Sequence, residues 1–107
     1  MNRLEHSILK NLIYNEDYTR KVMPFINQEY FSDSTEKFLF KEVKDFIEKY
    51  KVMPTKEALV INFVESKTLT EEQVRGCVEL VNEIQQHKDE PTETQWLTEQ
   101  TEKFCQD

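Results

Sequence analysis

The segment from residue 34 to residue 51 carries a stripe of large apolar side chains at helical spacing. Its main members lie four, three and four residues apart, which returns each side chain to one face of an α-helix and does not fit the two-residue alternation of a strand. The stripe consists of Leu39, Phe40, Val43, Phe46, Ile47 and Tyr50. We therefore expect 34–51 to form the central core helix, with Phe46 and Tyr50 among its inward-facing side chains.

Five further segments show the same spacing, separated by short breaks. They are residues 3–14, 16–23, 55–66, 70–87 and 92–107, and the irregular stretch 24–31 is expected to be a loop held to the core by aromatic side chains. In 55–66 the apolar side is formed by Leu59, Phe63 and Val64. The chain has one glycine and three prolines in 107 residues, which argues against hairpin turns and against disorder. The sequence predicts an all-α fold, a compact orthogonal bundle of about six helices forming one domain over residues 1–107.

Residues that cap helices stand before most of these segments. The expected N-caps are Asn15, Asp33, Thr55, Thr70 and Thr92. Glutamate or glutamine follows three residues after Asp33, Thr70 and Thr92, which predicts a capping box at each of these three positions. Gly76 lies inside the 70–87 helix, where it is unfavourable against alanine by about 1 kcal/mol unless it allows a close helix crossing.

Charge and length exclude several classes of protein. The formal net charge is −7, so a basic face for nucleic-acid phosphates is not expected. No apolar run approaches the roughly 20 residues that span a membrane, and the first residues show no signal peptide. Cys77 and Cys105 fall on apolar helix faces, so we expect reduced thiols in a cytoplasm, although their sequence positions leave a disulfide between them open.

The sequence offers no recognisable catalytic, metal or cofactor site. A phosphate-binding loop needs several glycines, and this chain has one. Histidines and cysteines are scattered too widely for a zinc site: they are His6, Cys77, His87 and Cys105. Neighbouring carboxylates are expected among 21 acidic residues and are interpreted as solvated or helix-terminal charges.

The last segment supplies the candidate interface residues. Trp96 stands in its first turn, where it either packs on the domain's own core or anchors a contact between subunits, a setting in which tryptophan is enriched. Together with Leu97 and Phe104 it is expected to form an exposed apolar edge. The segment 92–107 ends without a capping residue, so we expect it to continue into a helical hairpin of a longer polypeptide.

Three stretches, in this order, resemble a known family. They are Tyr30-Phe31 before a long aromatic-rich helix, the junction 51–59 with Pro54-Thr55 at its centre, and the run 96–104. Together they resemble the N-terminal domain of DnaB-type replicative DNA helicases, most of all the version found in T-even-type bacteriophages.

The resemblance implies a function that the residues alone do not. Members of the family are hexameric rings that unwind the replication fork, and they bind ATP or GTP with Mg in a C-terminal domain that is not part of this sequence. Their N-terminal domain supports assembly with neighbouring helicase subunits and offers a docking surface for primase, with a helicase loader as a further partner. The resemblance also implies the cytoplasm of a bacterial host. The net charge of −7 and the lack of a long apolar run separately lead us to expect no direct nucleic acid binding and no membrane binding by this chain. In the family a hairpin beyond the last helix makes much of the contact between neighbouring N-terminal domains, so its truncation puts self-assembly of this chain in doubt.

Two other interpretations remain open. One is a stand-alone acidic phage protein that binds a host protein or imitates the charge of DNA, although acidic and basic residues are mixed here and not arranged in acidic rows. The other is a small enzyme with an unrecognised site.

Overall fold

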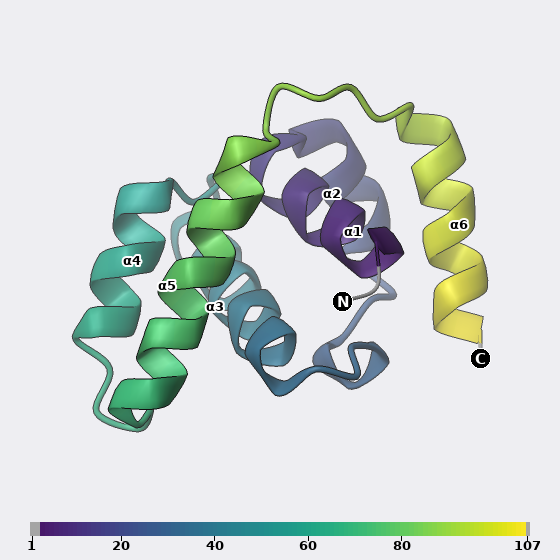
Figure 1. Ribbon diagram of the computed structural model, residues 1–107. Coiled ribbons are helices and arrows are strands. Elements are labelled where there is room, and N and C mark those ends of the chain that lie inside the picture. The colour runs from purple at the N-terminus through teal and green to yellow at the C-terminus, as the bar shows by residue number, and fades with distance from the viewer. Residues whose placement is uncertain (1–2, 107) are drawn as a thin grey trace.

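The computed structural model describes residues 3–106, and these fold into six α-helices and one short 3-10 helix, with no strand in this range (Figure 1). The helices are α1 (Arg3–Tyr14), α2 (Glu16–Val22), η1 (Gln28–Tyr30), α3 (Ser34–Tyr50), α4 (Lys56–Val64), α5 (Glu71–Gln86) and α6 (Thr94–Gln106). The all-α fold is thereby confirmed. Residues 1, 2 and 107, which the expected domain includes, lie outside the described residues.

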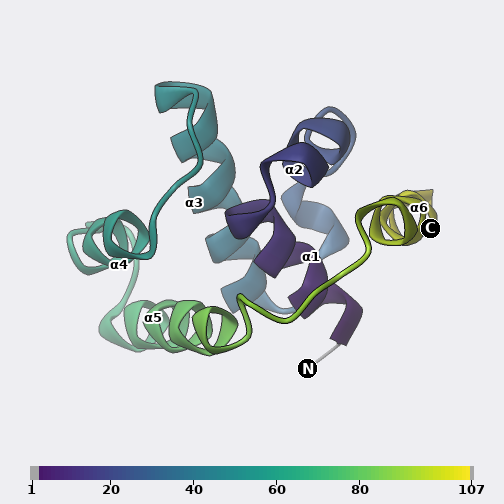
Figure 2. The same ribbon diagram turned by 90° about the horizontal axis from the view of Figure 1, so that it is seen from above.

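Helix α1 occupies the middle of the bundle and packs against α2, α3, α5 and α6. Helices α4 and α5 run antiparallel on one side of it, and α6 lies on the opposite side, where it packs chiefly on α2 (Figures 1 and 2). The buried apolar side chains of all these helices form one continuous core. The two outermost elements, α4 and α6, are therefore the ones with the most surface turned away from that core.

Four of the five expected N-caps are confirmed. The side chains of Asn15, Asp33, Thr55 and Thr70 each accept a hydrogen bond from a backbone N–H in the first turn that follows. At Thr70 the capping box is complete, because Gln73 N–H donates to Thr70 Oγ1 at 3.1 Å and Thr70 N–H donates to Gln73 Oε1 at 2.9 Å. These bonds satisfy backbone donors that a helix start leaves without partners.

The other two expected capping boxes are wrong. Asp33 caps α3 as expected, but the Glu36 side chain is buried inside the fold and does not close the box. Helix α6 begins at Thr94, and its first amides donate to the Glu93 carboxylate, so Thr92 is not the cap. The burial of Glu36 outweighs the local sequence pattern at Asp33. The better position of Glu93 outweighs it at Thr92.

The fully buried core side chains of α3 end at Val43, and half-buried Ile47 packs against them. Leu39, Phe40 and Val43 are fully buried or nearly so, whereas Phe46 is half-buried and Tyr50 is 53% exposed, which corrects the expectation that both pack inside. The C-terminal end of α3 extends past the other helices (Figure 2), so the apolar stripe continues beyond the elements that could cover it. There the two aromatic rings pack on each other, with centroids 4.7 Å apart.

Gly76 lies where α5 crosses α3. A Cβ atom at this position would stand 3.3 Å from Thr35 Oγ1, closer than side chains normally approach. The glycine therefore allows the close crossing that the sequence left open.

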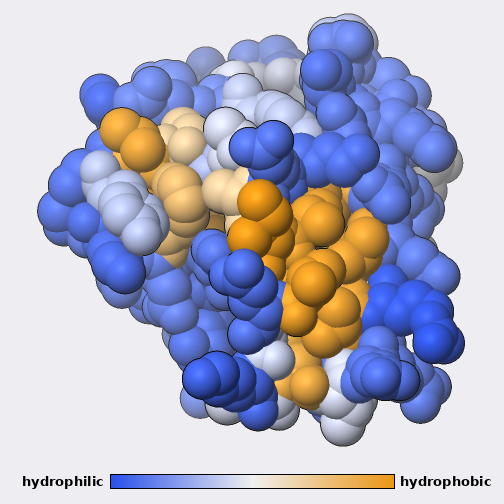
Figure 3. Space-filling view, turned by 90° about the vertical axis from the view of Figure 1, so that its left-hand side faces the viewer, coloured by the Kyte–Doolittle hydropathy of each residue, from blue (hydrophilic) through white to orange (hydrophobic). Residues whose placement is uncertain are grey.

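Helix α4 exposes Val64, which the sequence placed inside, and with it Ile61, for which the sequence made no prediction. Leu59 and Phe63 are buried as expected, but Val64 is 62% exposed and Ile61 is 46% exposed. Seen from the side of α4, the surface carries a broad apolar patch (Figure 3). Six of the nine residues of α4 are apolar and encircle the helix, so the stripe that faces the core could not be chosen from spacing alone.

Candidate protein interface on helix α6

The inner face of α6 holds the helix to the domain. Leu97 is fully buried and Thr101 is buried beside it, both on the side of α6 that packs on α2. The hydroxyl groups of Tyr18 and Thr101 lie 2.6 Å apart in a hydrogen bond, and burial raises the pKa of Tyr18 well above its ordinary range. This polar link inside an apolar contact fixes the rotation of α6 about its axis.

Phe104 also belongs to the inner face. Its ring lies edge-on to Tyr30, with centroids 6.3 Å apart, and to Phe31, with centroids 5.9 Å apart. These are the geometries that aromatic pairs prefer. The expected exposed apolar edge is therefore wrong for Leu97, which has no accessible surface, and holds only in part for half-buried Phe104.

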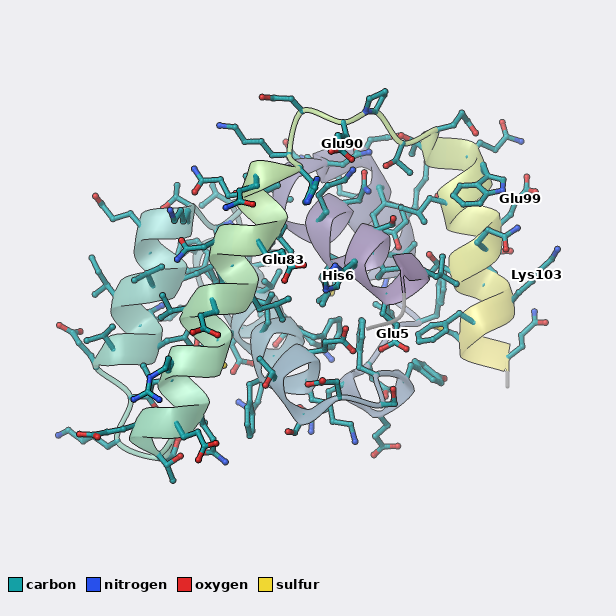
Figure 4. All side chains as sticks on the ribbon, viewed as in Figure 1. Glu5, His6, Glu83, Glu90, Glu99 and Lys103 are labelled. Atoms are coloured by element: carbon teal, nitrogen blue, oxygen red, sulfur yellow. The ribbon has the colours of Figure 1, made fainter. Side chains whose placement is uncertain are left out.

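Trp96 lies on the outer face of α6 and is 51% exposed. Of the two interpretations that the sequence allowed, packing on the domain's own core does not describe this side chain. Glu99 and Lys103, which also belong to the exposed side of α6, point away from the body of the molecule (Figure 4). An indole with half its surface in water, beside charges of both signs, is the kind of side chain that anchors protein contacts.

The linker before α6 is tied down at two points. Lys10 Nζ on α1 donates a hydrogen bond to the Glu90 carbonyl at 2.9 Å, and Asn15 Nδ2 donates to Thr94 Oγ1 at 3.0 Å. Trp96 is thus presented from an element whose start and inner face are both anchored, which reduces the entropy lost when a partner covers it.

The described residues offer little reactive chemistry. Burial raises the pKa of the Cys77 thiol to about 11 and also raises that of Cys105, so both thiols stay protonated at neutral pH. Within residues 3–106 no three histidine, cysteine or acidic side chains are grouped to hold a metal ion. Over the same residues, no helix is long and apolar enough to cross a bilayer.

Glu5 on α1 and Glu36 on α3 form a buried pair of carboxyl groups that the sequence did not predict. Glu5 is 4% exposed and Glu36 is 1% exposed, and in each side chain Oε2 has no hydrogen-bond partner among the described residues. Burial, a hydrogen bond with Glu5 and the negative charge of Glu5 raise the pKa of Glu36 to about 8. No sequence signal separates these two glutamates from the exposed ones, because both stand in ordinary amphipathic helices.

Comparison with known proteins agrees with the family resemblance of the three ordered stretches described above. No protein-family model matches the chain. A curated protein, the DnaB-like replicative helicase of Enterobacteria phage T4, is 32% identical to it over 99 residues. This similarity covers 92% of the chain and 20% of the phage protein. The chain is thus related in sequence to the DnaB-type replicative helicases, as its ordered segments predicted, over a length that is about one-fifth of the phage T4 relative.

Proposed function

We propose that this chain is the N-terminal assembly and docking domain of a hexameric, ATP-dependent replicative DNA helicase. The observation that carries the proposal is the similarity over 92% of the chain to a DnaB-like replicative helicase, of which the match covers 20%. In this role the chain contacts neighbouring helicase subunits and receives primase and a helicase loader, in the cytoplasm of a bacterial host. ATP or GTP and Mg would be bound outside this chain.

The geometry of α6 supports the assembly part of the proposal. Trp96 is exposed on a helix whose position is fixed by Leu97, Thr101 and Phe104. Leu97 and Phe104 support the interface from beneath, because their own surfaces are used within the domain. One tryptophan and its surroundings fall well short of the roughly 1,200 Å² that stable interfaces bury, so the 107-residue chain alone should be monomeric or weakly self-associating.

Sedimentation of two proteins at matched concentrations tests the proposal. One is the 107-residue chain, and the other is the full-length helicase that the proposal requires, with Mg and ATP present. We expect a hexamer for the longer protein and a monomer or weak oligomer for the shorter one. A longer protein that remains monomeric at tens of micromolar would refute the assembly role and favour a stand-alone acidic protein that binds a host protein.

Trp96→Ala in the full-length protein tests the contact itself. We expect the concentration at which the hexamer dissociates to rise by at least about tenfold, in the range of a tryptophan hot spot. Tyr50→Ala is the matched control, because Tyr50 is an aromatic residue of nearly equal exposure on α3. Equal dissociation of the two variants would remove Trp96 from the interface while leaving the assembly role intact.

A further inference from the structure

The α4–α5 hairpin presents an apolar surface that is only partly covered: Val60, Val74 and Val78 pack against the core and keep some accessible surface, whereas Ile61 and Val64 are exposed. On α4, Ile61 and Val64 are exposed and Val60 is half-buried. On α5, Val74 and Val78 are half-buried and stand one helical turn apart, so they share a face. Helices α4 and α5 pack side by side, and the view from the side of α4 shows an apolar patch on this part of the surface (Figure 3). A helix that is apolar all round is normally covered, and α4 is covered on one side only.

The charges of the α4–α5 hairpin are mostly negative and form no ion pairs among the described residues. Glu79 and Glu83 line a hollow beside Asp33 and Thr35 at the start of α3, and the other glutamates lie on α4 or near the turn that joins α4 to α5. Within residues 56–86 all six glutamates are exposed, against two exposed cations, Lys67 and Arg75. The glutamates are Glu57, Glu65, Glu71, Glu72, Glu79 and Glu83. Among the described residues, none of the six forms an ion pair within 4 Å, although such pairs occur elsewhere on α2 and α3. The hairpin therefore combines an apolar strip with unpaired carboxylates.

We propose that the α4–α5 hairpin docks a basic amphipathic helix of a partner protein, with apolar side chains on the patch and lysine or arginine on the glutamates on α4 and near the turn. The inference rests on the proposed docking role and specifies its surface and the chemistry of its partner. A helix with apolar residues at i, i+3, i+4 and i+7 fits such a strip, and flanking cations give it orientation. A second copy of the chain fits less well, because it would bring the same glutamates against each other on a protein of net charge −7.

The test uses the 107-residue chain and a defined peptide. The probe is a fluorescently labelled helical peptide of about 18 residues, with leucine on one face and lysine on its flanks. One comparison peptide has the same composition with its leucines distributed around the helix, and another has glutamate in place of lysine. Fluorescence anisotropy should give a Kd of about 10–100 µM for the probe, weakening with salt, and at least tenfold weaker binding for both comparison peptides.

Variants of the chain locate the binding surface. Ile61→Thr with Val64→Thr should weaken binding of the probe at least tenfold, and Glu65→Gln with Glu71→Gln should weaken it about threefold. Trp96→Thr and the pair Glu99→Gln with Glu102→Gln are the matched controls on α6 and should change binding less than twofold. Helicity measured by circular dichroism must be unchanged in every variant that enters the comparison.

Several results would overturn the inference. Equal binding of the probe to the wild-type chain and to the Ile61→Thr, Val64→Thr variant would show that the hairpin is not the site. Equal binding of the redistributed peptide would reduce the effect to non-specific charge attraction. A dimer of the 107-residue chain that these two substitutions dissociate would make a second copy the occupant. None of these results depends on ring assembly, so the inference can fail while the proposed function stands.

Discussion

Glu36→Gln is the substitution that best tests the electrostatics of this fold. Glu36 is 1% exposed and faces Glu5 across the contact between α1 and α3, and its pKa is raised from an ordinary 4.5 to about 8. At neutral pH the folded chain therefore holds a proton on Glu36 that the unfolded chain has released. Folding takes up that proton, and the free energy of this uptake is subtracted from stability.

The direction in which stability changes with pH follows from which state, folded or unfolded, keeps the proton on Glu36. Below about pH 4.5 both states carry it, and the stabilising contribution of the neutral acid is complete. As pH rises from 4.5 towards 8, the unfolded state ionises first, so the free energy of unfolding falls across this window. One pKa unit corresponds to 1.36 kcal/mol, so between pH 5 and pH 7 the loss is about 2–3 kcal/mol. Glutamine keeps the shape and the hydrogen-bonding capacity of the neutral acid but cannot ionise.

Urea denaturation followed by circular dichroism from pH 5 to pH 8 measures the effect. The Glu36→Gln variant should lose most of the fall in stability and exceed the wild type at pH 7 by about 2–3 kcal/mol. Glu48→Gln on the same helix is the control, because Glu48 is exposed, and it should change stability by less than about 0.5 kcal/mol. If wild type and Glu36→Gln had parallel pH profiles, Glu36 would be ionised in the fold and the reasoning would be refuted.

Three other predictions follow from burial, hydrogen bonding and charge. Leu39→Ala should destabilise the chain by about 2–5 kcal/mol, as for a buried leucine. Phe46→Ala should cost only about 1 kcal/mol, since Phe46 is half-buried and its ring packs on exposed Tyr50. Equal losses in urea denaturation would contradict the placement of Phe46. Tyr18→Phe removes the hydroxyl partner of Thr101 and should lower stability by about 1 kcal/mol, measured by thermal unfolding and contradicted by an unchanged midpoint. Labelled single-stranded DNA should show no anisotropy change with the chain at physiological salt, given its net charge of −7; a salt-sensitive micromolar complex would reveal a basic face.

The positions of the helices could be predicted from sequence because their signals are local. Apolar spacing and capping residues placed all six α-helices, with ends that differ by no more than two residues from those of the structure. The N-caps Asn15, Asp33, Thr55 and Thr70 each need only an oxygen that reaches an amide two or three residues away. At the exposed caps Asp33, Thr55 and Thr70 nothing distant in the chain competes with such a contact; half-buried Asn15 also donates through Nδ2 to Thr94, while its Oδ1 accepts from Tyr18 N–H.

Which face of each helix is buried could not be predicted so well, because it depends on which other helices pack against it. Phe46 and Tyr50 continue the apolar stripe of α3, but that end of the helix extends past its neighbours. On α6 the sequence placed Leu97 and Trp96 together on one edge, although adjacent residues point about 100° apart on a helix. The buried position of Leu97 follows from the Tyr18–Thr101 contact, which joins residues 83 positions apart and leaves no local signal.

The two candidate surfaces lie at opposite ends of the molecule, and this makes their independence testable. Trp96 belongs to α6 and Ile61 to α4, the two helices farthest apart across the bundle (Figures 1 and 2). If α6 contacts a neighbouring subunit while the hairpin holds a basic helix, both can be occupied at once. Substitutions at distant sites without shared partners are normally additive within about 0.5 kcal/mol.

A double-mutant cycle in the full-length protein puts this independence to the test. Trp96→Ala and Ile61→Thr should each affect only its own contact, the first ring dissociation and the second peptide affinity, and their combination should equal the sum of the separate effects. A coupling above about 1 kcal/mol in either readout would mean that the surfaces communicate or that one partner covers both. A single shared partner would then replace the two separate contacts, and α6 would take part in assembly through that partner.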